Sequence, residues 1–490
     1  MYGKITLSGQ FFNPPAEGIV DMLKFICIIL SFFQVGLFNL VSLGKTQTIG
    51  VNRYMEYQTS EGFGTSSAWW SQTIKDEETA REVARLLYDK ETGLGLNIYR
   101  YNIGGGEADN PDCRIWDVTR RTESFLYLDE SDGQWKYDFT RDANAVRMMK
   151  LAVEYGADEV VLFCNSPHYS MTASGHASGG LEKQVNNLPE ENYQAFVNYV
   201  LTIADHFVEE GIPVKYISPI NEPQWDWGGE WVGQEGCHYD VDECIKLLEL
   251  FAVTMQERNC PYGLSGPESG QLTWEHYEYV DKFMQSEILR NYCDHFAGHS
   301  YWMDYNYDGK KAFGEKMKNE YPDMKFEMTE WCELPLEIDS TTIDSGLRMA
   351  NIINQDLCFM GASSWSSWTA VNGDGLMEIK DGKLVIYNRY YAYMHYSRFI
   401  EKGMKRVDVM DSKEYTDIAS LAYRGNGKTV IVLVNNAQDD IKLNFTGAYG
   451  KYEVYQTDAS HNCEKVKEGL LFTGTTIPAR SIQTITVTGG

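Results

Sequence analysis

The chain has 490 residues and a formal net charge of −27 at pH 7. This length exceeds that of one ordinary domain and predicts two or three folding units. The acidic balance argues against nucleic acid and anionic membrane surfaces as partners, because binding phosphate needs clustered Lys and Arg. Aromatic residues make up 13% of the chain, and tryptophans in loops suit a groove that stacks on flat apolar faces such as those of pyranose rings. A neutral substrate fits this composition best.

A mostly apolar stretch runs from Phe25 to Leu43, between Lys24 and Lys45. Residues 1–45 are therefore predicted to be a signal peptide or membrane anchor, or else a misassigned start outside the working protein. If the leader is real, the protein is secreted or membrane-anchored, and membrane contact is expected only in that case. Without a leader, a cytoplasmic location is expected.

After residue 45, short β-branched or apolar runs alternate with amphipathic helical stretches. Eight runs are predicted as strands, at Glu61–Ala68, Leu96–Ile103, Glu159–Asn165, Val214–Asn221, Tyr262–Pro267, His295–Tyr301, Lys325–Glu330 and Ala362–Ala370. The helical patterns between them are Asp76–Tyr88, Arg141–Tyr155, Glu190–Glu210, Val241–Gln256 and Ser345–Cys358. Strands alternating with helices predict a parallel sheet, and eight such units match a (β/α)₈ TIM barrel over residues 61–403.

The pattern changes near Met404, after which no long helical stretch occurs. Short alternating segments follow at Ile418–Tyr423, Thr429–Asn435, Ile441–Thr446, Tyr452–Thr457 and Ile482–Thr488. They predict a small antiparallel β-sandwich over residues 404–490, beside the barrel. A further strand-like stretch precedes the first barrel strand, and we expect residues 46–60 to join that sandwich.

Two glutamates stand at the ends of predicted strands four and seven. Glu222 follows Asn221 and precedes Pro223, and Glu330 closes the seventh strand. Catalytic groups of such barrels project from the C-terminal strand ends, so the two carboxylates are expected to face each other. Glycoside hydrolysis needs such a pair, and retention of configuration requires a separation of about 5 Å. A single Glu at a strand end is more often a salt-bridge member, but two at these positions favour catalysis.

The surroundings of the two glutamates are expected to separate their pKa values. Arg100, at the end of the second strand, is the nearest plausible cation to keep Glu330 ionised. Glu222 is then the expected protonated partner, with its pKa raised by the charge of Glu330.

No metal or cofactor is expected. His295 and His299 have the spacing of a zinc-binding helix, but they lie in a strand and lack the HExxH glutamate. The segment Gly425–Thr429 resembles the end of a phosphate loop without its leading glycine and is predicted to be a hairpin turn.

The ordered set of motifs resembles glycoside hydrolase family 30. The matching pieces are Tyr57–Gly64, Gly95–Asn102, Asn165–Pro167, Asn221–Gln224, His299–Tyr301, Met328–Glu330, Trp365–Trp368 and Ile477–Ser481. The resemblance covers residues 46–490 and implies a retaining enzyme with Glu222 as acid/base and Glu330 as nucleophile. It implies that Arg100, Asn165, Asn221, His299, Tyr301 and Trp368 line the subsite around the cleaved bond, and Asn102, Trp70, Trp225 and Trp365 complete the expected substrate-binding set.

The resemblance leaves the sugar open, because the family includes glucosylceramidases, glucuronoxylan xylanases, β-1,6-glucanases and β-1,6-galactanases. Three stretches are most similar to the galactanases: Gly64–Trp70, Arg100–Gly106 and Gln234–Cys237. The glucuronoxylan enzymes use an arginine after strand eight, where this chain has Asp374. We expect β-1,6-galactan of arabinogalactan side chains as the substrate. Glucosylceramide, β-1,6-glucan or xylan specificity is the alternative within the family, and a non-catalytic carbohydrate-binding protein is the alternative of another class.

Overall fold

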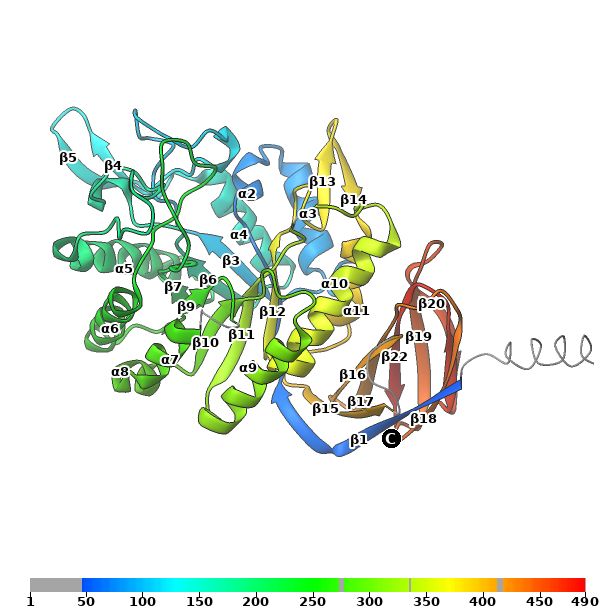
Figure 1. Ribbon diagram of the computed structural model, residues 1–490. Helices are drawn as coiled ribbons and strands as arrows, with labels where there is room; N and C mark the ends of the chain where they lie inside the picture. The colour runs from blue at the N-terminus through cyan, green and yellow to red at the C-terminus, as the bar shows by residue number, and fades with distance from the viewer. Residues whose placement is uncertain (1–45, 273–276, 335, 412–416, 490) are drawn as a thin grey trace, which may run out of the picture.

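A computed structural model describes residues 46–489, except 273–276, 335 and 412–416. The fold consists of a barrel of parallel strands surrounded by helices and a second, mainly antiparallel sheet at one side (Figure 1). The expected leader lies outside the described residues. Within the ranges just given, no helix is both long and apolar enough to span a membrane.

The barrel sheet is parallel throughout, with the order β8-β7-β6-β3-β2-β12-β11-β10-β9. Its strands are β2 Gly62–Ser66, β3 Ile98–Asn102, β6 Glu159–Phe163, β7 Val214–Ser218, β8 Gly263–Leu264, β9 Pro267–Ser269, β10 His295–His299, β11 Lys325–Glu330 and β12 Ser364–Thr369. The two ends of this order, β8 and β9, are pieces of one segment. Ser265 donates its N–H to Ile217 on one side, and Gly266 accepts the N–H of Ala297 on the other, so the sheet closes. The predicted (β/α)₈ barrel is confirmed, with its fifth strand divided in two.

Helices cover the outside of this barrel, so its strands are buried on both faces, as parallel strands usually are. The helices are α2 Trp70–Thr73, α3 Glu77–Tyr88, α4 Ala143–Tyr155, α5 Tyr193–Glu209, α6 Val241–Arg258, α7 Tyr277–Gln285, α8 Glu287–Tyr292, α9 Tyr307–Glu320, α10 Ile343–Gln355 and α11 Asn388–Ser397. Local sequence sets where they begin: the Asp76 carboxylate accepts the N–H of Thr79 at 2.7 Å and caps α3. Two hairpins, β4 Leu126–Asp129 with β5 Gln134–Tyr137 and β13 Met377–Lys380 with β14 Lys383–Ile386, interrupt the alternation.

The second sheet has the order β20-β19-β22-β17-β16-β15-β1-β18-β21. It contains β1 Thr46–Thr59, β15 Lys405–Asp411, β16 Ile418–Gly425, β17 Lys428–Asn435, β18 Ile441–Thr446, β19 Lys451–Thr457, β20 Asn462–Gly469, β21 Gly474–Ile477 and β22 Ser481–Thr488. The stretch expected to precede the barrel is β1, which pairs antiparallel with β15 and parallel with β18. The strands β15, β20 and β21 were absent from the sequence-based expectation.

The side chains of β17 alternate between its two faces and pack against both parts of the fold. Ile431 and Leu433 point into the core of the second sheet, whereas Val430, Val432 and Val434 pack with the barrel and its helices. The second sheet therefore buries one face against α10 and α11, and the barrel gains a fixed support on the side where these helices lie (Figure 1).

A buried ion pair gives the fold a testable weak point. Lys310 on α9 lies 2.7 Å from Asp356, which follows α10, and both side chains are fully buried. Lys310→Met leaves the carboxylate buried without its cation, so we expect the free energy of unfolding to fall by about 3–5 kcal/mol in urea denaturation. Lys405→Met is the control: its ion pair with Glu56 has the same 2.7 Å length but is half exposed, and its loss is expected to cost about 1 kcal/mol or less. Equal losses of stability in the two variants would contradict the larger cost expected for breaking the buried pair.

Candidate active site

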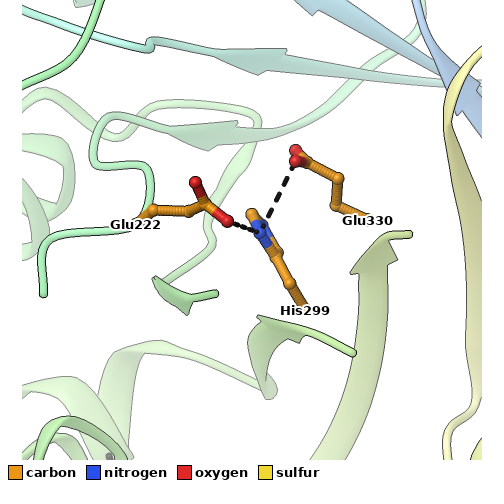
Figure 2. Close-up of side chains that lie close together, drawn as sticks. All are labelled: Glu222, His299 and Glu330. Carbon is orange, nitrogen blue, oxygen red and sulfur yellow. Dashed lines mark hydrogen bonds and ion pairs between the residues drawn. The ribbon is translucent and has the colours of Figure 1, made fainter. Parts of the chain in front are cut away.

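The two predicted glutamates meet at the barrel mouth. One carboxylate oxygen of Glu222, one of Glu330 and a ring nitrogen of His299 all lie within 4.8 Å of one another (Figure 2). Glu330 is the last residue of β11, and Glu222 follows β7. Both are buried, at 3% and 7% exposure respectively. The structure thus brings the pair as close as the sequence-based hypothesis requires.

The backbone around Glu222 is strained. Glu222 has a φ of 47° and Glu268 a φ of 58°, both in the left-handed region that disfavours side chains other than glycine. The Glu222 N–H donates to the Glu268 carbonyl at 3.0 Å and fixes the two residues against each other. Such strain persists only where the surrounding structure enforces it, and it occurs most often at functional sites.

His299 connects three carboxyl groups. Its Nδ1 lies 3.0 Å from Glu222 Oε1 and 3.7 Å from Glu330 Oε1, and its Nε2 lies 3.1 Å from Glu268 Oε2. Burial lowers the pKa of His299, but the negative charges of Glu330, Glu222 and Glu268 outweigh it and raise the pKa to about 10. His299 is therefore an imidazolium at neutral pH. Glu222, His299 and Glu330 also have the separation of metal ligands, and a metal ion there would have to displace the proton of His299.

Arg100 supplies the second buried positive charge. Its guanidinium lies 3.2 Å from Glu330 Oε2 and 3.6 Å from Glu268 Oε1, and it donates to the Thr329 carbonyl at 2.9 Å. Tyr301 donates its hydroxyl to Glu330 Oε1 at 3.0 Å. Glu330 therefore accepts hydrogen bonds from a guanidinium and a phenol, and both donors favour its ionised form.

Glu268, the first residue after Pro267 on β9, completes the cluster and was absent from the predicted site. It is fully buried and accepts from Ser218 Oγ at 2.7 Å and from Thr329. Burial raises the pKa of Glu268, but Arg100, His299 and Thr329 outweigh it and hold the pKa at about 2. Its place at the end of the fifth strand is the only sequence signal for it.

Two cations and three carboxyl groups make up the cluster. Arg100 and His299 carry the positive charges, and Glu268 is ionised because its pKa is held at about 2. Burial raises the pKa of Glu330 and the charge of Glu222 raises it further, while His299 and Arg100 lower it. Arg100 contacts Glu330 as expected, but burial outweighs its effect on the pKa.

Three expected asparagines are buried at or just after the C-terminal ends of β3, β6 and β7. Asn165 donates to Asn102 Oδ1 at 3.1 Å, and both are buried. The side-chain oxygens of Asn165 and Asn221 have no hydrogen-bond partner among the described residues. Buried amide oxygens of this kind are suited to bind hydroxyl groups.

Trp368 and Trp225 lie at the mouth, as expected. Trp368 packs edge-on against Phe163 at 6.0 Å, and Phe163 itself lies under the Arg100 guanidinium at 4.4 Å. Trp225 is next to Glu222, because a Cβ added at Gly270 would come within 2.5 Å of both Trp225 Nε1 and Glu222 Oε1. These two rings flank the carboxyl cluster.

Trp365 and Trp70 are not brought to the cluster. Trp365 donates its indole N–H to Asp356 at 2.9 Å and packs on Tyr393 of α11 at 5.3 Å, so it lies between the barrel and its helices. Trp70 is buried and donates to the Ser66 carbonyl at 2.8 Å. Its neighbour Trp69 instead packs edge-on against Trp368 at 5.3 Å.

Comparison with known proteins points to one family. A family model described as O-glycosyl hydrolase family 30 matches residues 46–382. An endo-β-1,6-galactanase of Hypocrea rufa is 24% identical over 445 residues, covering 83% of this chain and 85% of the relative. A glucuronoxylanase of Bacillus subtilis is 22% identical over 483 residues, covering 95% and 98%. The crystal structure of a conserved exported protein from Bacteroides fragilis matches with a TM-score of 0.81 at 26% identity, covering 90% of this chain and 100% of that one.

The charge of His299 is open to direct measurement. We expect its ring nitrogens to stay protonated from pH 6 to 9 in ¹⁵N NMR and to lose a proton only near the raised pKa of about 10. Because the folded pKa is raised, the stabilisation from this proton is complete below about pH 6.5 and is lost as pH rises through about 10. Glu268→Gln, which removes one neighbouring charge, should lower the pKa. Titration of the wild-type ring near 6.5 would refute this account.

Proposed function

We propose, since the chain belongs to O-glycosyl hydrolase family 30, that it cleaves β-linked glycans by double displacement, with retention of configuration. Family membership makes it an O-glycosyl hydrolase and not a sugar-binding protein without activity. The observation that carries the proposal is the closeness of Glu222 and Glu330, whose nearest oxygens lie within 4.8 Å. Retaining enzymes hold the two carboxyl groups about 5–5.5 Å apart, whereas inverting enzymes leave about 6.5–9.5 Å for a water.

Each step assigns one task to each glutamate. Glu222 donates its proton to the glycosidic oxygen as the bond from that oxygen to the anomeric carbon breaks, and a Glu330 oxygen bonds to that carbon. The leaving group departs as an alcohol. Glu222, now a carboxylate, takes a proton from water, and the water oxygen displaces Glu330 from the anomeric carbon. Two inversions at one carbon give net retention.

The contacts of the two carboxyl groups support this division of roles. Glu330 accepts from Arg100 at 3.2 Å and from Tyr301 at 3.0 Å, whereas His299 is the hydrogen-bond partner of Glu222 at 3.0 Å. Donors stabilise the charged form of a carboxyl, so the guanidinium and the phenol suit Glu330 to the role of ionised nucleophile. When Glu330 becomes an ester its negative charge disappears, and Glu222 can then accept a proton from water.

For the substrate we propose β-1,6-galactan. Support comes from the endo-β-1,6-galactanase relative at 24% identity and from the three galactanase-like stretches of the sequence. In the fold these stretches contact one another: Ser67 donates its N–H to the Arg100 carbonyl at 2.8 Å, and Gly105 donates to Glu235 at 3.1 Å. The three stretches are therefore connected to one another, and they lie at or beyond the C-terminal ends of β2, β3 and β7.

Glucuronoxylan fits the site less well. Asp374 follows β12 and lies 3.8 Å from Cys332 Sγ, and Cys332 in turn contacts Tyr301 at 3.7 Å. A carboxylate near the nucleophile's own partner repels a glucuronate group. The net charge of −27 acts in the same direction.

A substrate panel tests this specificity. We expect reducing sugar to be released from β-1,6-galactan, with kcat/KM at least about tenfold above that for glucuronoxylan, β-1,6-glucan or glucosylceramide. If Asp374 repels glucuronate, Asp374→Asn should improve the cleavage of glucuronoxylan relative to the wild type. Glucuronoxylan as the best substrate of the wild type would contradict this repulsion.

Azide distinguishes the roles of the two glutamates. Glu222→Ala and Glu330→Ala should each lower kcat/KM on the preferred glycan by about a thousandfold or more. With an activated aryl glycoside, azide should rescue Glu222→Ala by attacking the glycosyl-enzyme, which gives a β-glycosyl azide. In Glu330→Ala it should attack the substrate directly and give the α-glycosyl azide. The opposite pair of products would reverse the assignment.

A further inference from the structure

Two tryptophan rings stand exposed at the barrel mouth. Trp116 is 59% exposed and Trp231 is 77% exposed. Trp116 lies in the loop that follows β3 and Trp231 in the loop that follows β7, so both loops leave the C-terminal ends of barrel strands, where the catalytic glutamates lie. A single exposed apolar residue needs no explanation, but two large rings on joined loops indicate a binding surface.

The two loops are joined by a short parallel bridge. Ile115 pairs with Val232, and Trp116 donates its N–H to the Val232 carbonyl at 3.1 Å. Ile115 is fully buried, so alternation along the extended chain turns Trp116 and Trp231 to the opposite, outer face. The Trp116 ring rests against Gly233, where an added Cβ would lie 3.6 Å from it, and this packing leaves the rest of the indole in solvent.

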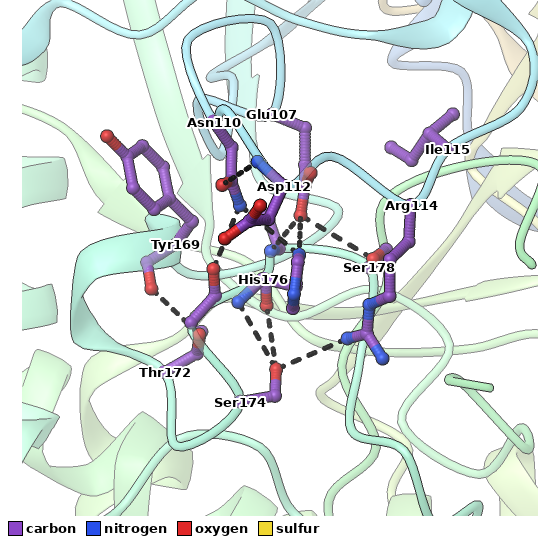
Figure 3. A network of polar contacts seen from close by, with 12 residues as sticks. Glu107, Asn110, Asp112, Arg114, Ile115, Tyr169, Thr172, Ser174, His176 and Ser178 are labelled. Carbon is purple, nitrogen blue, oxygen red and sulfur yellow. Dashed lines mark hydrogen bonds and ion pairs between the residues drawn. The ribbon is translucent and has the colours of Figure 1, made fainter. Parts of the chain in front are cut away.

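A polar network holds this bridge in place (Figure 3). Arg114 donates to the Gly229 carbonyl at 3.1 Å and to the Gly179 carbonyl at 2.6 Å. Glu107 is fully buried and lies 3.6 Å from His176 Nδ1. These contacts fix the loops that follow β3, β6 and β7 to one another. A surface fixed in this way loses little conformational entropy when it binds.

A line of contacts leads from this surface back to the active site. Arg120 donates to Oε1 of Gln234 at 3.2 Å, and Gln234 belongs to the same loop as Trp231. The Arg120 guanidinium lies 4.7 Å from the centre of the Trp69 ring. Trp69 packs against Trp368 at 5.3 Å, beside the carboxyl cluster. Arg120 keeps 30% of its side chain exposed and can donate to hydroxyl groups.

We propose that Trp116 and Trp231 form a distal subsite, which stacks on sugar rings of the substrate beyond those that flank the cleaved bond. The proposal rests on the proposed function, because its occupant is the glycan chain being cleaved. Aromatic faces pack against the apolar C–H faces of sugar rings, and the net charge of −27 favours a neutral chain over an anionic one. The subsite makes the enzyme selective for long substrates.

Trp116→Ala and Trp231→Ala test this subsite by chain length. For each variant, kcat/KM is measured on polymeric β-1,6-galactan and on the shortest β-1,6-galacto-oligosaccharide that the wild type cleaves. The ratio of the two values should fall about tenfold, through a higher KM on the polymer. Tyr54→Ala is the control, because Tyr54 is a ring 84% exposed on β1 of the other sheet. This control should leave both values unchanged.

An unchanged ratio in both tryptophan variants overturns the subsite, and so does an equal loss on both substrates, which indicates distortion of the active site. Failure of the wild type on galactan refutes only the galactan proposal. The same ratio is then measured on xylan or β-1,6-glucan, whichever is cleaved. A wild type that cleaves none of these polymers overturns the subsite together with the proposed function.

Discussion

His299 holds a positive charge at the centre of the barrel mouth, with Glu222 on one ring nitrogen and Glu268 on the other. Arg100 lies on the far side of Glu330 and supplies the second charge. Burying charged groups is costly unless they are paired, so these residues stabilise one another and none can be removed without exposing the others to that cost. The proposed acid, Glu222, and the proposed nucleophile, Glu330, lie within this balance of buried charges.

This balance depends on Glu268, which does not touch the reacting atoms in the proposed mechanism. With its pKa held at about 2, Glu268 is ionised at every working pH and keeps His299 charged. Its left-handed backbone and its hydrogen bond to Glu222 also fix where the acid/base group lies. The split of the fifth strand into β8 and β9 is the local feature that brings Glu268 into the barrel mouth.

The strand and helix periodicities predict the barrel because its strands are short buried runs that alternate with amphipathic helices along most of the described chain. The charged strand β20 could not be found in this way: it lies at the edge of its sheet, where exposed charges replace alternation. Similarly, sequence motifs place Glu222 and Glu330 correctly but say little about neighbouring side chains. Trp365 and Trp368 are an odd number of residues apart on one strand, so their side chains point to opposite faces, and only Trp368 lies at the mouth.

Sequence motifs also fail to show which side chains surround Trp70 and Glu268. The chain turns sharply after β2, so that Trp69 and not Trp70 reaches Trp368, and no pattern in the sequence marks that turn. Glu268 is one acidic residue among 70, and its importance appears only once Arg100 and His299 are seen beside it. Contacts between distant segments decide both cases, and such contacts are set by the closed barrel.

The proposed retaining mechanism rests on the short distance between Glu222 and Glu330. The anomeric configuration of the first product tests this mechanism most directly. In ¹H NMR spectra recorded during the first minutes of hydrolysis of a β-linked substrate, the account predicts that the β-anomer of the new reducing end appears first and the α-anomer only later, by mutarotation. First appearance of the α-anomer would show inversion by a single displacement and would contradict the assignment of Glu330 as nucleophile.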